Sequence, residues 1–174
     1  MSPSAEDISR EFIQESVHLL QQSAGKINHC LNQLDTDQIW WRPRPELNSI
    51  GNLILHLCGN LKQWAVCGIT GSVDERQRSQ EFRADVKVSR DDLQSLMHRT
   101  IEQACLTMQS LSAPALLEKR EIQGFSVSVL GAISHTVPHF VGHTHQIIYL
   151  TRLQKGDQYQ FDWSPDSDQE GVPI

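Results

Sequence analysis

The stretch HTVPHFVGHTHQI, residues 135–147, holds four histidines and no formally charged side chain. In a helix, His135, His139 and His143 lie on one side, about 6 Å apart along the axis. His145 lies about 200° round the helix from His143 and points nearly the opposite way. One metal ion can be held by histidines at i and i+4, with nitrogens about 2.0–2.1 Å away. The pair is therefore His135 with His139, or His139 with His143.

A third ligand must come from another part of the chain, and His56 in NLILHLCGN is the candidate. Asn52, Asn60 and Gln63 share its side of a helix and form a polar stripe beside an apolar face. The stripe either faces water or lines a polar pocket inside the fold. The surroundings of the paired histidines are apolar and uncharged, and a buried imidazole needs a partner for both ring nitrogens. A metal ion is one such partner.

Four stretches have the apolar periodicity of helices: residues 5–34, residues 48 or 49 to 68 or 71, residue 89 to just before 114, and residues 127–153. Residues typical of N-caps begin three of them: Ser4 and Ser89, each with an aspartate three residues on, and Asn48 or Ser49. Residues 71–88 are polar and aperiodic, and residues 118–129 favour a short extended piece. The pattern predicts an all-α four-helix bundle with a long crossover connection between helices 2 and 3 and negligible sheet.

The length of 174 residues predicts one domain, residues 1–155, followed by an acidic C-terminal tail, residues 156–174. The net charge of −6 and the lack of a basic stripe exclude nucleic acid as a partner. The N-terminus lacks the pattern of a secretory signal. Residues 127–150 contain no Asp, Glu, Lys or Arg, but their histidines, glutamine and proline favour a buried helix over a membrane span. Four cysteines without C-x-x-C spacing indicate reduced thiols in a cytoplasmic protein.

Two segments, NSIGNLILHLCGNLKQW (48–64) and HTVPHFVGHTHQIIYLT (135–151), together resemble the DinB-like superfamily of small bacterial metal-binding four-helix bundles. The resemblance extends over about residues 8–155. In that superfamily, one histidine of the second helix and two of an H-x-x-x-H-x-x-Q motif bind a divalent metal. The resemblance therefore implies His56, His139 and His143 as ligands, with Gln146 orienting a ligand or a bound water. It also implies a homodimer and a zinc or nickel ion, with iron or manganese as alternatives.

The chain departs from the superfamily pattern at two positions. Relatives commonly have glycine just before the glutamine, where this chain has His145. Pro138 lies inside the fourth helix, where its ring removes one backbone hydrogen bond and is expected to kink the chain. A kink immediately before His139 would re-aim that ligand.

Three neutral imidazoles leave a divalent ion one open position for water or substrate, as in catalytic zinc sites. Such an ion lowers the pKa of bound water to about 7, or holds a substrate thiol as thiolate. Some relatives use low-molecular-weight thiols, so the resemblance implies a metal-dependent thiol S-transferase with an electrophilic small-molecule substrate. The alternatives are a non-catalytic stress-response module that binds metal or a small ligand, and a metal-free bundle with a histidine seam. No carboxylate lies within the histidine motif, so the general base is unassigned among His29, His135 and His145.

Overall fold

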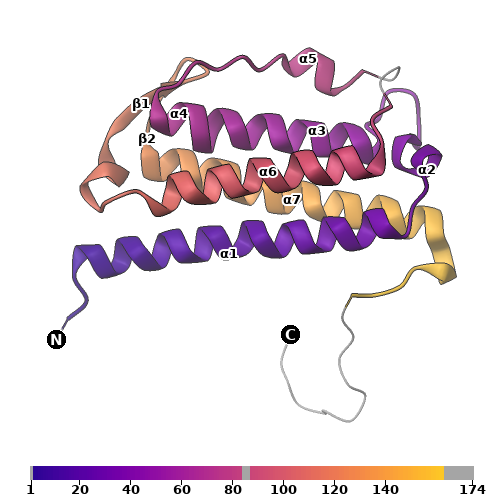
Figure 1. The fold of residues 1–174 in the computed structure, drawn as a ribbon, viewed down its shortest axis with the longest axis horizontal. Coiled ribbons are helices and arrows are strands. Elements are labelled where there is room, and N and C mark those ends of the chain that lie inside the picture. Colours follow the sequence, from indigo (N-terminus) through magenta and orange to yellow (C-terminus); the bar gives the residue numbers. More distant parts are fainter. Residues whose placement is uncertain (1, 84–86, 163–174) are drawn as a thin grey trace, which may run out of the picture.

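A computed structural model describes residues 2–83 and 87–162, which are mostly helical. Four long helical stretches lie side by side (Figure 1): α1 (Ala5–Asn32); α3 (Ile50–Leu61), which continues through a π-helical turn (Lys62–Cys67) into α4 (Gly68–Thr70); α6 (Arg90–Gln109); and α7 (Val129–Lys155). Both α1 and α3 pack against α6 and against α7. The α1–α6 and α3–α7 pairs therefore form opposite sides of the structure. The predicted all-α fold is confirmed.

Hydroxyl side chains start the long helices as the sequence predicts. Ser4 and Ser49 each accept a hydrogen bond from the backbone N–H three residues on, and a side-chain oxygen of that residue accepts one from the backbone N–H of the serine. Ser49, and not Asn48, is thus the cap of α3. Ser89 caps α6 in the same way through the N–H of Asp92. These caps satisfy backbone donors that a helix start leaves without partners.

Shorter elements connect the long ones: α2 (Thr36–Trp40), α5 (Arg78–Glu81), two 3-10 turns (Pro114–Leu117 and Gly156–Gln158), and the strands β1 (Lys119–Ile122) and β2 (Phe125–Ser128). The strands form an antiparallel hairpin in which Ile122 lies opposite Phe125. Its two turn residues, Gln123 and Gly124, both have positive φ, 53° and 80°, as two-residue hairpin turns require. The short extended piece expected in this region is thus a complete hairpin.

The uncharged stretch forms α7, which has one buried and one exposed side. Ile133, Phe140 and Ile147 are buried in the core, whereas Tyr149 and Leu153 are exposed. The helix runs through Pro138 without a break, and Ser134, whose carbonyl loses its helical partner there, is exposed. Among the described residues, no helix combines the length and apolar character needed to cross a membrane. All four cysteines are buried and free.

The polar connection after α4 follows the outer side of α3 and carries the chain back along it (Figure 1). Its contacts to the bundle are polar and specific. The side-chain amide of Asn52 donates to the carbonyls of Glu81 and Arg83, at 2.9 and 3.0 Å. Arg42 donates to the carbonyl of Phe82 at 2.8 Å and to Oδ1 of Asn52 at 2.7 Å. The connection is therefore fixed against the first turn of α3.

The close contact between α2 and α3 makes Gly51 sensitive to substitution. A Cβ at Gly51 would lie 2.8–2.9 Å from the ring of Trp40, whereas a Cβ at Gly25 of α1 would meet nothing within 4 Å. We expect Gly25→Ala to raise the free energy of unfolding by about 0.5–1 kcal/mol, because alanine is the better helix former. We expect Gly51→Ala to be less stable than Gly25→Ala by about 1–3 kcal/mol, because the rigid indole ring must shift. Urea unfolding of both variants measures the difference, and equal stabilities would contradict this packing.

Candidate metal centre

Three histidines from two helices meet between α3 and α7. His56 of α3 and His139 and His143 of α7 each offer one ring nitrogen, and these three atoms lie within 4.8 Å of one another. Nε2 of His56 is 3.2 Å from Nε2 of His139. Two imidazole nitrogens bound to one tetrahedral zinc ion lie about 3.3 Å apart, given bonds of about 2.0–2.1 Å. The donor set therefore fits a divalent metal ion, and it is the only such group of His, Cys, Asp and Glu within residues 2–83 and 87–162.

The polar stripe of α3 faces α7 and the connection, not water. Asn52 and Asn60, one turn before and one turn after His56, are both buried. Oδ1 of Asn60 accepts a hydrogen bond of 2.8 Å from the hydroxyl of Thr136 on α7. The water-facing interpretation of the stripe is therefore wrong. The asparagine–threonine bond fixes α3 against α7 one turn away from the histidines.

The other histidines of α7 lie outside the cluster. His135 is exposed and packs against Trp64, with ring centroids 4.2 Å apart and the rings tilted by 39°, and its centroid is 6.2 Å from that of His139. His145 is exposed, and its Nδ1 donates to the carbonyl of Val141 at 2.9 Å. Of the two pairs open from the sequence, the structure thus brings His139 and His143 to His56.

The remaining candidate for a general base lies elsewhere. His29 donates through Nε2 to the carbonyl of Gln160, 2.6 Å away, beside the chain that follows α7. This contact ties the end of the described chain to α1 and is unrelated to the cluster. Of the three histidines considered for this role, His135 alone adjoins a residue of the cluster.

Gln146 contacts a histidine of the cluster. Nδ1 of His143 lies 2.7 Å from Oε1 of Gln146. An amide oxygen only accepts, so Nδ1 carries the proton and Nε2 keeps its lone pair. In this orientation the amide of Gln146 accepts from Nδ1–H of His143 and leaves Nε2 free to bind a metal. Nδ1 of His139, by contrast, is buried without a hydrogen bond to any described residue.

A carboxylate reaches the cluster from the connection between α4 and α6. Oε2 of Glu81 lies 2.9 Å from Nδ1 of His56. Arg76 donates to both carboxylate oxygens, through Nε at 2.6 Å and Nη2 at 2.8 Å. A Cβ at Gly59 would collide with the carboxylate of Glu81, so the glycine of HLCGN leaves the space that the carboxylate occupies. The sequence offered no signal for Arg76 and Glu81, because they lie in an aperiodic polar stretch.

Burial controls the protonation of the cluster. Burial, and next the positive charges of neighbouring His143 and His56, lower the pKa of His139 to about 4. Burial also lowers the pKa of His143, against the hydrogen bond with Gln146, which raises it. Burial raises the pKa of Glu81, but hydrogen bonds from Arg76 and His56 outweigh burial and leave that pKa below its usual value. At neutral pH both α7 ligands are therefore neutral and Glu81 is ionised.

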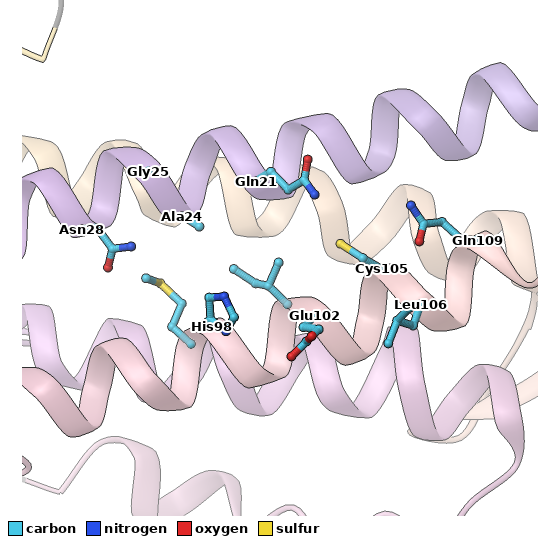
Figure 2. Close-up of a pocket in the computed structure, with 11 residues that line it drawn as sticks. Gln21, Ala24, Gly25, Asn28, His98, Glu102, Cys105, Leu106 and Gln109 are labelled. Carbon is cyan, nitrogen blue, oxygen red and sulfur yellow. The ribbon is translucent and has the colours of Figure 1, made fainter.

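A groove on the opposite side of the structure has a different character. It lies between α1 and α6, with a volume of about 460 Å³ (Figure 2). His98, Glu102 and Cys105 line its α6 side, and Gln21 and Asn28 its α1 side. These groups do not form a cluster of three metal-ligand atoms in the part of the chain that the structure describes. Within that part of the chain, the candidate metal centre therefore lies on the α3–α7 side.

Comparisons with known proteins agree with this architecture. The model of the family described as "Protein of unknown function (DUF1572)" matches residues 7–164. A DinB-like protein from Bacillus cereus ATCC 10987 has a similar structure, with a TM-score of 0.61 and 13% identity over 78% of this chain and 90% of that chain. A DinB-like protein from Bacillus subtilis has a TM-score of 0.63 and 14% identity over 84% of this chain and 96% of that chain. Likeness at these identities shows the fold. No functionally curated protein matches the chain.

The low pKa of His139 predicts how acid affects the metal-free protein. The pKa is about 4 in the folded state and about 6.5 in an unfolded chain, so the unfolded state binds more protons between these pH values. The titration of His139 therefore does not lower the free energy of unfolding above pH 6.5. As the pH falls from 6.5 to 4, the free energy of unfolding is expected to decrease. Urea unfolding with a chelator present measures this slope.

Two variants serve as probe and control for the acid effect. His139→Gln should reduce the slope, because glutamine does not titrate. His98→Gln, an exposed site on α6, should leave the slope unchanged. Stability of the wild type that increases on acidification between pH 6.5 and 4 would contradict a buried neutral imidazole.

Proposed function

The chain belongs to the DinB-like family DUF1572, and we propose that it is a divalent-metal protein whose ion is held by His56, His139 and His143. The observation that carries this proposal is the convergence of three imidazole nitrogens, from two helices, within 4.8 Å. Imidazole suits zinc, nickel and iron, whereas manganese prefers oxygen ligands. Zinc or nickel is the first choice, with iron and manganese as alternatives.

The finer proposal is that the protein is a metal-dependent thiol S-transferase. Among residues 2–83 and 87–162, no fourth His, Cys, Asp or Glu joins the cluster, and His139 and His143 are partly exposed. A divalent ion with three imidazole ligands supplies a Lewis acid with one open position. In the transfer, the thiol sulfur forms a bond to an electrophilic carbon, the leaving group departs with the bonding electron pair, and the thiol proton passes to solvent. The chain's own part is to present neutral imidazoles and to hold their orientation.

Metal content of histidine variants tests the ligand set. His56→Ala, His139→Ala and His143→Ala should each lose most of the bound metal, because each removes one of three donors. His135→Ala and His145→Ala should retain it, since neither side chain joins the cluster. Elemental analysis of the purified proteins, after loading with zinc or nickel and desalting, gives the ratio of metal to protein. Loss of metal from His135→Ala but not from His143→Ala would place the ligands one turn earlier on α7.

Thiol consumption tests the proposed reaction. The zinc- or nickel-loaded protein is incubated with a low-molecular-weight thiol and a chloro-substituted aromatic acceptor, and formation of the thioether and release of chloride are measured. We expect turnover that requires the metal, increases with pH as the thiol ionises, and disappears in His139→Ala and His143→Ala. His135→Ala tests whether this exposed neighbour of His139 takes part. Stoichiometric metal binding without turnover over a broad panel of thiols and acceptors would refute the transferase and favour the non-catalytic binding module.

A further inference from the structure

The connection between α4 and α6 places a buried ion pair beside a metal-ligand histidine. The side chains of Arg76 and Glu81 are only 5% and 10% exposed, although the residues around them in sequence are polar and mostly exposed. Burial of a charged pair away from water is costly unless hydrogen bonds satisfy both groups. Here the carboxylate accepts two hydrogen bonds from Arg76, and the third nitrogen of the guanidinium, Nη1, donates to Oε1 of Gln63 at 2.7 Å. Both charged groups thus have hydrogen-bond partners inside the protein, which is more than the folding of a surface connection requires.

The geometry at Nδ1 of His56 decides which ring nitrogen carries the proton. Nδ1 lies 2.9 Å from Oε2 of Glu81 and 3.1 Å from Nη2 of Arg76. An unprotonated Nδ1 would oppose the carboxylate lone pairs, whereas Nδ1–H can donate to Oε2. Nη2 has a second hydrogen that an unprotonated Nδ1 could accept, but Oε2 lies nearer to Nδ1 and belongs to the ionised carboxylate, which favours Nδ1–H as the donor. Nδ1 is therefore the protonated nitrogen, and Nε2 presents its lone pair towards His139 and His143.

We propose that Glu81 is a positioning residue of the metal centre, which holds His56 in its Nδ1–H tautomer while Arg76 fixes the carboxylate. The inference rests on the proposed metal-binding function and deepens it. Carboxylates and carbonyl oxygens that accept from the far nitrogen of a metal-bound imidazole orient the ring and raise its basicity. Glu81 does so for His56, as the amide oxygen of Gln146 does for His143.

The contacts of the connection support this assignment because they fix the carboxylate from several directions. Asn52 binds the backbone carbonyl of Glu81 itself, and Arg42 binds that of Phe82. The ring of Phe82 lies against His56, with centroids 5.0 Å apart. Gly59, three residues after His56 on α3, provides the space for the carboxylate. The connection thus forms one wall of the metal centre.

Zinc affinity of two matched variants tests the proposal. Glu81→Gln keeps the size of the side chain, but its amide can donate to Nδ1 as well as accept from it. The Nδ1–H tautomer is then no longer enforced, and we expect the dissociation constant for zinc to rise about 10–100-fold. Glu75→Gln makes the same change of charge at an exposed residue of the same connection and should leave the dissociation constant unchanged. Competition with a chromogenic zinc chelator gives both constants, and circular dichroism shows whether each variant keeps its helices.

The tautomer of His56 in the metal-free wild type provides a second measurement, which needs no variant to fold. Nitrogen-15 chemical shifts of the imidazole are expected to show Nδ1 protonated, and Glu81→Gln should shift the population towards Nε2–H. A purely structural role for Glu81 would leave this population unchanged. A dominant Nε2–H form in the wild type, or zinc affinity of Glu81→Gln within twofold of the wild type, would overturn the proposal. Failure of the wild type to bind zinc would instead refute the proposed metal function, while the tautomer measurement would still decide the role of Glu81.

Discussion

A buried imidazole needs a partner for each of its two ring nitrogens, and this requirement applies to His56, around which several elements of the structure are arranged. Its Nδ1 faces Glu81 and its Nε2 faces His139. The first contact requires the chain after α4 to return along α3, and the second requires α3 and α7 to pack side by side. The path of the connection and the packing of α3 against α7 are therefore both linked to the side chain of His56.

The charges around this side chain are balanced inside the protein. Ionised Glu81 is paired with Arg76, and His139 and His143 are neutral because burial lowers their pKa values. A buried ion pair contributes little net stability, since desolvation offsets the attraction between the charges. Its value here lies in geometry: the guanidinium fixes both carboxylate oxygens, and the carboxylate fixes the imidazole. The polar groups between α3, α7 and the connection consequently specify one arrangement of the three metal-ligand candidates.

Helices and their starts follow from short-range information in the chain. The apolar periodicity and the caps at Ser4, Ser49 and Ser89 depend on residues within a few positions, so the four long helices could be predicted. The turn at Gln123 and Gly124 lacks the Asn-Gly or Asp-Gly pair typical of such hairpins, so the β-hairpin was foreseen only as an extended piece. The homodimer stays a prediction, because the contacts of a single chain do not determine its assembly.

The sequence by itself determined that the candidate ligands on α7 share one helical side, because a spacing of four residues places side chains together in any α-helix. Spacing left His135 and His143 as equal partners for His139. The tertiary structure brings His143 to His56, because that choice depends on how α3 is placed along α7. It alone also revealed Glu81, which lies 25 positions from His56 in sequence and 2.9 Å from it in space. A contact of this kind depends on the path of an aperiodic connection, which no local pattern encodes.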